Sequence, residues 1–192
     1  MDSFVNSLYL ERKTIACIKQ QLISPKSIQL YHFLQQPIFR FLHSSLQKCS
    51  WHHEHAAHIH SFSTPSTIPL PIKTLLTVLD SDEWAMWLLL ATGKEVKLKK
   101  QRLQLFGTGD YTLQHDIQER GIHCMIALTS IWGTNWGGYT SLVKEGKEIV
   151  RINPIPNSLT LFEQKKGMAS FVKYINHRAG NKKHIVIHAL YA

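Results

Sequence analysis

Apolar residues recur at two different spacings along the chain, and the change falls near residue 95. Before it, residues 3–23 and residues 26–49 repeat apolar side chains every three or four positions, which is typical of amphipathic helices. Pro37 lies inside the second stretch. Because proline removes a helical hydrogen bond, we expect a kink or a break there.

Residues 72–91 show helical spacing again. The run Ser-Asp-Glu at 81–83 predicts the start of a further helix, capped by Ser81 or Asp80. Gly93 follows the last apolar residue and is expected to end that helix, because glycine readily adopts the left-handed conformation of a helix end.

Residues 50–71 differ from both neighbours. They open with the histidine-rich run WHHEHAAHIH and continue into Ser, Thr and Pro, which predicts a strand or loop leading into a proline-rich connection. A histidine cluster can bind a metal. We favour a partly exposed segment, because the run lacks the ligand spacing of a closed zinc site.

After residue 95 apolar residues alternate or form short runs, separated by glycine pairs and Pro-Asn turns. Short strands at such intervals are typical of a barrel or jelly roll. Helices followed by strands predict an α+β domain with helices on one side of a sheet. We treat residues 1–192 as a single domain, with a mostly helical support layer at 1–94 and a strand core at 95–192.

The composition of the chain indicates which kinds of molecule it can be expected to bind. The formal net charge of +9 suits anionic ligands, but no nucleic-acid-binding motif accompanies it, so we do not expect nucleic acid as a partner. No apolar run is long enough for a membrane span, and the N-terminus lacks the shape of a signal peptide. The three scattered cysteines favour reduced thiols and a cytoplasmic location.

Five segments appear in a fixed order over residues 103–190. They are GDYTLQHD at 109–116, WGTNWGG at 132–138, NPIPNSLTLF at 153–162, FVKYI at 171–175 and KKHIVI at 182–187. In this order they resemble the strands and turns of 2-oxoglutarate and iron(II)-dependent oxygenases of the prolyl-hydroxylase type. The resemblance implies a double-stranded β-helix, a jelly-roll or cupin-like fold, behind an N-terminal helical layer.

The resemblance also implies a metal site. Such enzymes hold iron with two histidines and one carboxylate and leave positions open for 2-oxoglutarate and oxygen. His115 fits the first histidine, and Asp116 is the nearest carboxylate, although the family places it one position later, where Ile117 stands. Neighbours on a strand point to opposite faces, so the chain must turn between them. A pair of Gln114 and Asp116 would keep the spacing with a poorer ligand.

The second half of the implied site is a further histidine and a basic residue for the far carboxylate of 2-oxoglutarate. Lys183, or Lys182 in a shifted register, is the basic candidate. In the family, the second histidine stands at a characteristic distance before the basic residue, and counting that distance back from Lys183 reaches Val172 or Lys173. Neither is a histidine, so the nearby His177 is considered as a displaced ligand.

Three further features of this half carry expectations. Tyr111 is assigned with Lys183 to the cofactor site, the alternative being that Asp110 and Tyr111 shape the turn before the strand. A tight turn is expected at 137–138, with at least one glycine at positive φ. The tryptophans at 132 and 136 are expected to pack at the barrel rim.

Two functions follow. The first is a dioxygenase that uses Fe(2+) and 2-oxoglutarate to hydroxylate a C–H bond of a protein, peptide or small-molecule substrate. The second is a catalytically inactive oxygenase-fold module that binds a protein or an anionic ligand. Two imidazoles and a carboxylate converging in the barrel favour the enzyme; an interior lined by Val172, Ile117 and other apolar groups favours the module.

Overall fold

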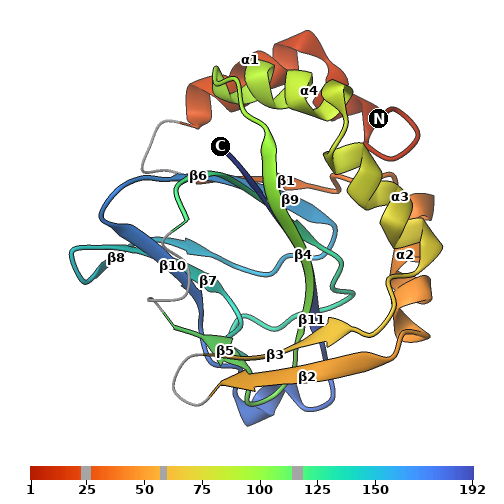
Figure 1. Ribbon diagram of the computed structural model, residues 1–192, viewed down its shortest axis with the longest axis vertical. Coiled ribbons are helices and arrows are strands. Elements are labelled where there is room, and N and C mark those ends of the chain that lie inside the picture. Colours follow the sequence, from red (N-terminus) through yellow and green to blue (C-terminus); the bar gives the residue numbers. More distant parts are fainter. Residues whose placement is uncertain (23–26, 57–59, 114–118) are drawn as a thin grey trace.

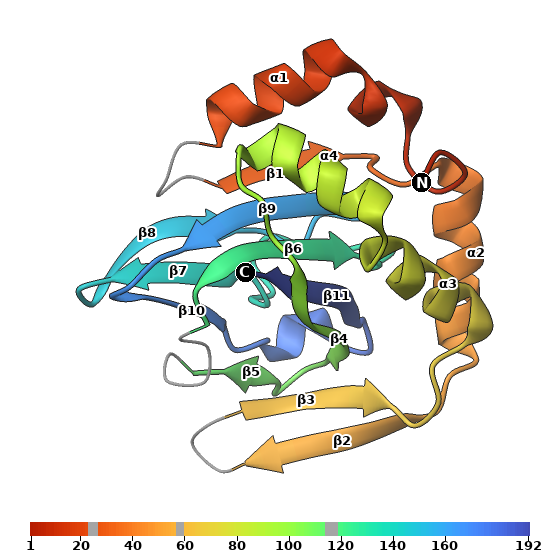
Figure 2. The same ribbon diagram turned by 45° about the horizontal axis from the view of Figure 1, so that its top comes forward.

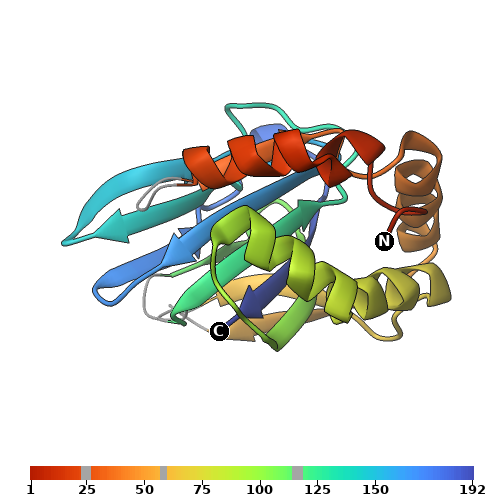
Figure 3. The same ribbon diagram turned by 90° about the horizontal axis from the view of Figure 1, so that it is seen from above.

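The computed structural model describes residues 1–22, 27–56, 60–113 and 119–192. Two antiparallel sheets face each other, and helices cover the outer side of the larger one (Figures 1, 2 and 3). The strand order is β1-β9-β6-β11-β4-β3-β2 in the larger sheet, with β5 paired to β3, and β10-β7-β8 in the smaller. No helix in the described ranges is both long and apolar enough to cross a membrane.

The element bounds are as follows. The helices are η1 (Ser7–Leu10), α1 (Arg12–Gln21), α2 (Gln36–Gln47), α3 (Leu70–Leu79), α4 (Asp82–Thr92) and η3 (His177–Ala179). The strands of the larger sheet are β1 (Ser27–Tyr31), β2 (Trp51–Ala56), β3 (His60–Pro65), β4 (Leu98–Phe106), β5 (Tyr111–Thr112), β6 (Gly121–Ala127), β9 (Ser158–Gln164) and β11 (His184–Tyr191). The smaller sheet contains β7 (Thr140–Lys144), β8 (Lys147–Ile152) and β10 (Met168–Val172).

The N-terminal half supplies strands as well as helices. The prediction of one helix over 26–49 was wrong in its first part, because Ile28 and Leu30 lie in β1 and pair with Leu161 and Leu159 of β9. Pro37 does not kink a helix. It stands at the start of α2, where a missing N–H leaves no helical hydrogen bond unmade.

The local helix signals are confirmed. The Ser81 hydroxyl accepts a hydrogen bond from the Trp84 amide at 3.2 Å and so caps α4. Gly93 ends the helix with a φ of 74°. Within residues 50–71 the strands β2 and β3 pair antiparallel, and the chain then leads into α3; of the predicted strand or loop, the described part forms strands.

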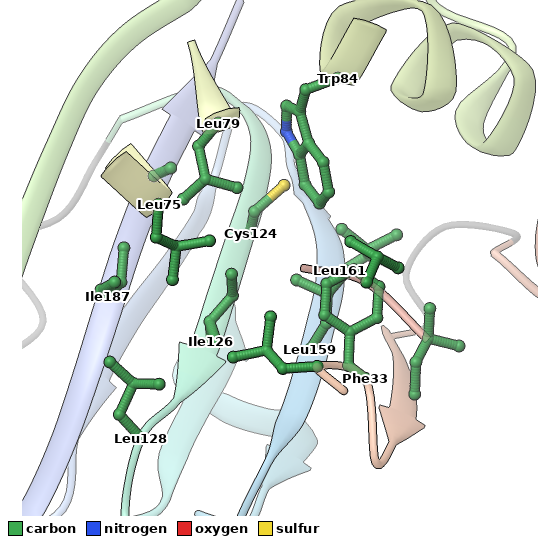
Figure 4. Packing of buried hydrophobic residues seen from close by; sticks show 14 of the residues in the cluster. Phe33, Leu75, Leu79, Trp84, Cys124, Ile126, Leu128, Leu159, Leu161 and Ile187 are labelled. Atoms are coloured by element: carbon green, nitrogen blue, oxygen red, sulfur yellow. The ribbon is translucent and has the colours of Figure 1, made fainter. Parts of the chain in front are cut away.

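The first hydrophobic core lies between the helices and the larger sheet. Figure 4 shows Leu75, Leu79 and Trp84 of the helical layer facing side chains of β6, β9 and β11. Trp84 also stacks on Trp87, with ring centroids 5.0 Å apart. Burial of such large apolar side chains is the main force that holds the helices on this face.

A second hydrophobic core fills the space between the two sheets. Its buried members come from both sheets and include Phe62, Phe106, Met125, Leu142, Phe162, Met168, Val172 and Val186. The two facing sheets with helices outside match the α+β arrangement that we predict from the sequence. The interior of this barrel is therefore packed with apolar side chains.

The turn at Gly137 and Gly138 also agrees with the prediction. Both residues have positive φ, 80° and 71°. The Gly138 amide donates to the Lys173 carbonyl at 2.9 Å and ties the turn to the end of β10. Trp132 and Trp136 meet edge to face beside it and pack partly buried against the second core, as expected for the rim.

Candidate functional site

The first pair of candidate ligands cannot be placed. His115 and Asp116, with the alternative residue Gln114 and with Ile117, lie at 114–118, outside the described residues. The short strand β5 leads toward them. Their assignment as iron ligands stays a prediction.

His177 lies in η3, after the end of β10, and its side chain is exposed. Its neighbour Asn176 accepts a hydrogen bond from the Arg178 amide at 2.9 Å, which fixes this turn at the surface. Ala179 is the buried residue of the turn. The structure does not bring His177 into the space between the sheets.

Lys183 is also exposed. Its Nζ lies against the backbone of Gly107, so close that a Cβ placed there would be 2.6 Å from it. The next residue, His184, is 2% exposed and enters the interior. Residues alternate between faces along a strand, so the shift by one position separates an outward lysine from an inward histidine.

His184 is therefore the residue at the start of β11 that faces the interior. Its Nδ1 lies 2.8 Å from the Thr129 hydroxyl, and its ring stacks on Phe106 at 5.9 Å between centroids. Burial lowers the pKa of His184 to about 3. The imidazole is neutral near pH 7 and supplies no positive charge for a carboxylate. The signal in the sequence that could have identified His184 is the alternation along β11. Residues 184, 186 and 188 share one face of the strand, and residues 185 and 187 share the other.

The inward positions of β10 carry no imidazole. Met168, Ser170 and Val172 alternate with partly exposed neighbours and are 6%, 1% and 6% exposed. The Val172 amide donates to the Thr112 hydroxyl at 2.8 Å and joins β10 to β5. Of the two positions reached by the family spacing, Val172 is thus part of the apolar core and Lys173 is exposed.

The cavity beside His184, between the sheets, is small. A cavity of about 10 Å³ is lined by residues that include Met125, Ile152, His184 and Val186. A single water molecule needs roughly 10–15 Å³ of such volume. The cavity has no room for a dicarboxylic acid such as 2-oxoglutarate.

These observations test the fit of the implied cofactors. Within the ranges that the structure describes, no group of three His, Cys, Asp or Glu side chains is placed to hold a metal ion. The one inward imidazole at the start of β11 is already hydrogen-bonded to Thr129 and lies between aromatic rings. The described residues do not fit iron and 2-oxoglutarate.

A pair of histidines, His123 buried and His188 partly buried, crosses the inner face of the larger sheet. His123 Nδ1 lies 2.8 Å from His188 Nε2, and His123 Nε2 lies 2.8 Å from the Glu119 carbonyl. If His123 donates to that carbonyl, His188 must donate to His123. Burial lowers the pKa of both rings, that of His188 to about 3, so both are neutral near pH 7. We did not anticipate this pair, since only strand pairing brings β6 and β11 together.

Ser61, His53 and Asp110 form a cluster that superficially matches a hydrolase triad. Asp110 Oδ1 accepts from the Ser61 hydroxyl at 2.5 Å and lies 3.2 Å from His53 Nε2. In a triad the histidine would stand between serine and aspartate and use a different nitrogen for each. Here the serine proton goes to the aspartate, and Asp110 Oδ2 accepts from the Gly107 amide at 2.7 Å. The cluster holds the turn before β5, the role that the sequence suggests for Asp110.

Tyr111 lies in β5 and is partly buried. With Leu113, Phe171 and Tyr174 it lines a largely apolar groove of about 250 Å³ between β5 and β10. Among the described residues, the groove shares none of its lining with the small cavity around His184. The assignment of Tyr111 to a cofactor site stays a prediction.

Comparison with known proteins extends these findings. The family described as "Oxoglutarate and iron-dependent oxygenase degradation C-term" matches residues 1–191. A prolyl 3-hydroxylase of Mus musculus, OGFOD1, is 34% identical over 89 residues, a match that covers 44% of this chain and 16% of the mouse protein. The chain thus corresponds to a small part of that relative's length.

Solved structures share the fold. A 2-oxoglutarate-iron(II) oxygenase-family oxidoreductase from Burkholderia pseudomallei aligns with a TM-score of 0.69 at 12% identity, covering 93% of this chain and 90% of the other. A Trichoplax adhaerens prolyl hydroxylase, in complex with a peptide of hypoxia inducible factor, aligns at 0.68 and 16%, covering 96% and 91%. A Pseudomonas putida prolyl-4-hydroxylase aligns at 0.65 and 14%, covering 92% and 97%.

Such likeness confirms the predicted double-stranded β-helix behind a helical layer. The oxygenase resemblance that the five segments indicate is confirmed as well, and the match over nearly all of the chain decides its membership. The chain belongs to the family of oxoglutarate- and iron-dependent oxygenase degradation C-terminal domains.

Proposed function

We propose that this domain is a catalytically inactive oxygenase-fold module that binds a protein partner. The observation that carries the proposal is the interior of the barrel: Met168, Ser170 and Val172 occupy the inward positions of β10, and the cavity beside His184 holds only about 10 Å³. A fold can persist while its site changes, so family membership alone does not establish turnover.

The chemistry of the interior supports this choice. Iron(II) in such sites is held by two imidazoles and a carboxylate on one face. Thioether, hydroxyl and isopropyl groups stand on β10 instead, and the apolar ones pack into the second core. Close packing of this kind stabilises the fold, whereas a hydrated metal site would need open space and polar neighbours.

A protein partner is supported by the relatives. The mouse relative is named a prolyl 3-hydroxylase, and one similar structure contains a peptide of hypoxia inducible factor. The positive charge of +9 would favour an acidic stretch of such a partner over a basic one. The cytosolic setting predicted from the cysteines suits this role, since all three thiols are free.

Hydroxylation of a peptidyl or small-molecule C–H bond is the second candidate, favoured by membership of an oxygenase family. It would require His115, Asp116 and His177 to hold the iron, with Lys183 on the 2-oxoglutarate carboxylate. When bound, iron and 2-oxoglutarate would supply the oxidising chemistry. Lys183→Ala would then raise the 2-oxoglutarate concentration needed, and Lys183→Arg would keep residual activity because charge is kept.

A turnover assay separates the two candidates. We expect the purified chain without a tag to form no succinate from 2-oxoglutarate above the background of iron alone. The His115→Ala variant should give the same trace. Iron-dependent succinate formation that His115→Ala abolishes, with an unchanged circular dichroism spectrum, would reject the inactive module.

A further inference from the structure

A pocket of about 410 Å³ lies on the inner face of the larger sheet, where β2 and β3 extend it beyond β4. Its walls come from β2, β3, β4 and the short strand β5, which lie side by side in Figure 1. It is distinct from the small cavity around His184, with which it shares no lining residue among those that the structure describes. His177, the candidate iron ligand that the structure describes, does not line it.

Arg102 of β4 is the cationic group of this pocket. It is partly buried, and within the described part of the chain its guanidinium has neither an ion pair nor a hydrogen bond. A partly desolvated charge without a partner costs free energy. Because guanidinium presents a planar fork of N–H donors, the partner that it fits best is a carboxylate or another planar oxyanion.

Glu54 of β2 is the anionic group of the same pocket. It is partly buried, and its Oε1 accepts a hydrogen bond from the Thr64 hydroxyl at 2.6 Å. No cation stands within ion-pair distance of it among the described residues. Opposite charges in one pocket normally pair with each other, but here Glu54 and Arg102 are held apart.

The floor between the two charges is aromatic. Phe62 is 7% exposed and lies 5.7 Å from Phe106 and 4.9 Å from the His60 ring, measured between centroids. Beside it, Gln104 is 7% exposed and lines the pocket with a polar side chain that can donate or accept. Convergent polar groups around an apolar floor are typical of small-molecule sites.

From these features we propose that the pocket binds a small zwitterion of the α-amino-acid type. The carboxylate would meet Arg102, the ammonium group Glu54, and an apolar side chain the ring of Phe62. The inference goes beyond the proposed function and does not depend on it, because it is argued only from Arg102, Glu54 and Phe62, none of which is considered for iron.

Titration with three related probes tests the proposal by two-dimensional NMR of the full chain. L-phenylalanine carries all three groups, L-phenylalaninamide lacks the carboxylate, and 3-phenylpropionate lacks the ammonium. We expect saturable shifts for L-phenylalanine at residues around Phe62 and Arg102, and affinity about tenfold or more weaker for each of the other two, since each lacks one charge-assisted contact. Equal affinity for all three probes would overturn the proposal that the pocket recognises a zwitterion.

Variants locate the site. Arg102→Gln should weaken L-phenylalanine about tenfold or more, and Glu54→Gln should bring its affinity down to that of 3-phenylpropionate. Arg178→Gln is the matched control, because Arg178 is exposed in η3 and lines no part of this pocket. Absence of saturable binding by the wild type, or an equal effect of the two arginine changes in proteins with native spectra, would reject the pocket. Neither result bears on iron binding, which is measured separately.

Discussion

At the scale of single residues, the buried histidines set how the protein responds to acid. His184 and His188 have a pKa of about 3 in the folded chain, against an ordinary value of 6.5, and burial is the largest cause for both. At a pH between these two values, the two histidines bind protons in the unfolded chain but stay neutral in the folded chain. The contribution of these two histidines to the free energy of unfolding is therefore at its full value above pH 6.5 and falls as the pH drops from there toward 3.

His184→Gln tests this linkage. Each buried histidine contributes up to about 1.4 kcal/mol per pH unit to the slope of stability, so removing one should flatten the slope by about that amount between pH 6 and 4. Urea unfolding across the pH series measures it. His177→Gln serves as the control, because His177 is exposed. A slope in His184→Gln that equals the wild-type slope would contradict a buried neutral imidazole.

A shift of one residue in the register of a strand explains why the site is harder to predict from the sequence than the fold. Sequence reasoning placed the basic residue at Lys183, but the strand turns His184 inward and leaves Lys183 against Gly107. A shift by one position exchanges the two faces of a strand. Only the pairing of β11 with β4 and β6, at positions far away in sequence, fixes that register.

At the scale of elements, signals that act within a few residues were predictable. The Ser81 cap and the Gly93 stop of α4 depend on local backbone groups, and both are confirmed. The sequence pattern predicts a helix where β1 forms. The prediction fails because the strand conformation of β1 depends on pairing with β9, more than a hundred residues later. Strand preference is decided by such neighbours more than by intrinsic propensity.

The glycine turn gives a prediction at this scale. A Cβ on Gly138 would lie 2.9 Å from the Trp132 ring and 3.1 Å from Ile175, at a φ of 71°. Gly138→Val should therefore lower the free energy of unfolding by more than about 1 kcal/mol, through backbone strain and crowding together.

Thermal and urea unfolding measure this effect. Gly180→Val separates the two causes, because Gly180 has a φ of 56° but no atom within 4 Å of a new Cβ. We expect a smaller loss at Gly180 than at Gly138. An unchanged melting temperature for Gly138→Val would count against the tight turn.

At the scale of the whole molecule, two hydrophobic cores lie on opposite faces of one sheet. The helical layer packs on the outer face, and the second core packs between the two sheets. The short apolar runs of the sequence predict such strands, since β6, β9 and β11 are buried almost throughout and so place side chains in both cores. The pattern did not show how tightly the interior is filled, because packing depends on side chains from both sheets.

Equilibrium binding of iron tests the central claim most directly. The chain without a tag, under anaerobic conditions and with 2-oxoglutarate present, is titrated with iron(II) in a calorimeter, and His115→Ala is titrated beside it. The inactive module predicts no saturable site of one metal per chain in either protein and no thermal stabilisation by iron. A saturable site of about one iron per chain that disappears in folded His115→Ala would contradict the account.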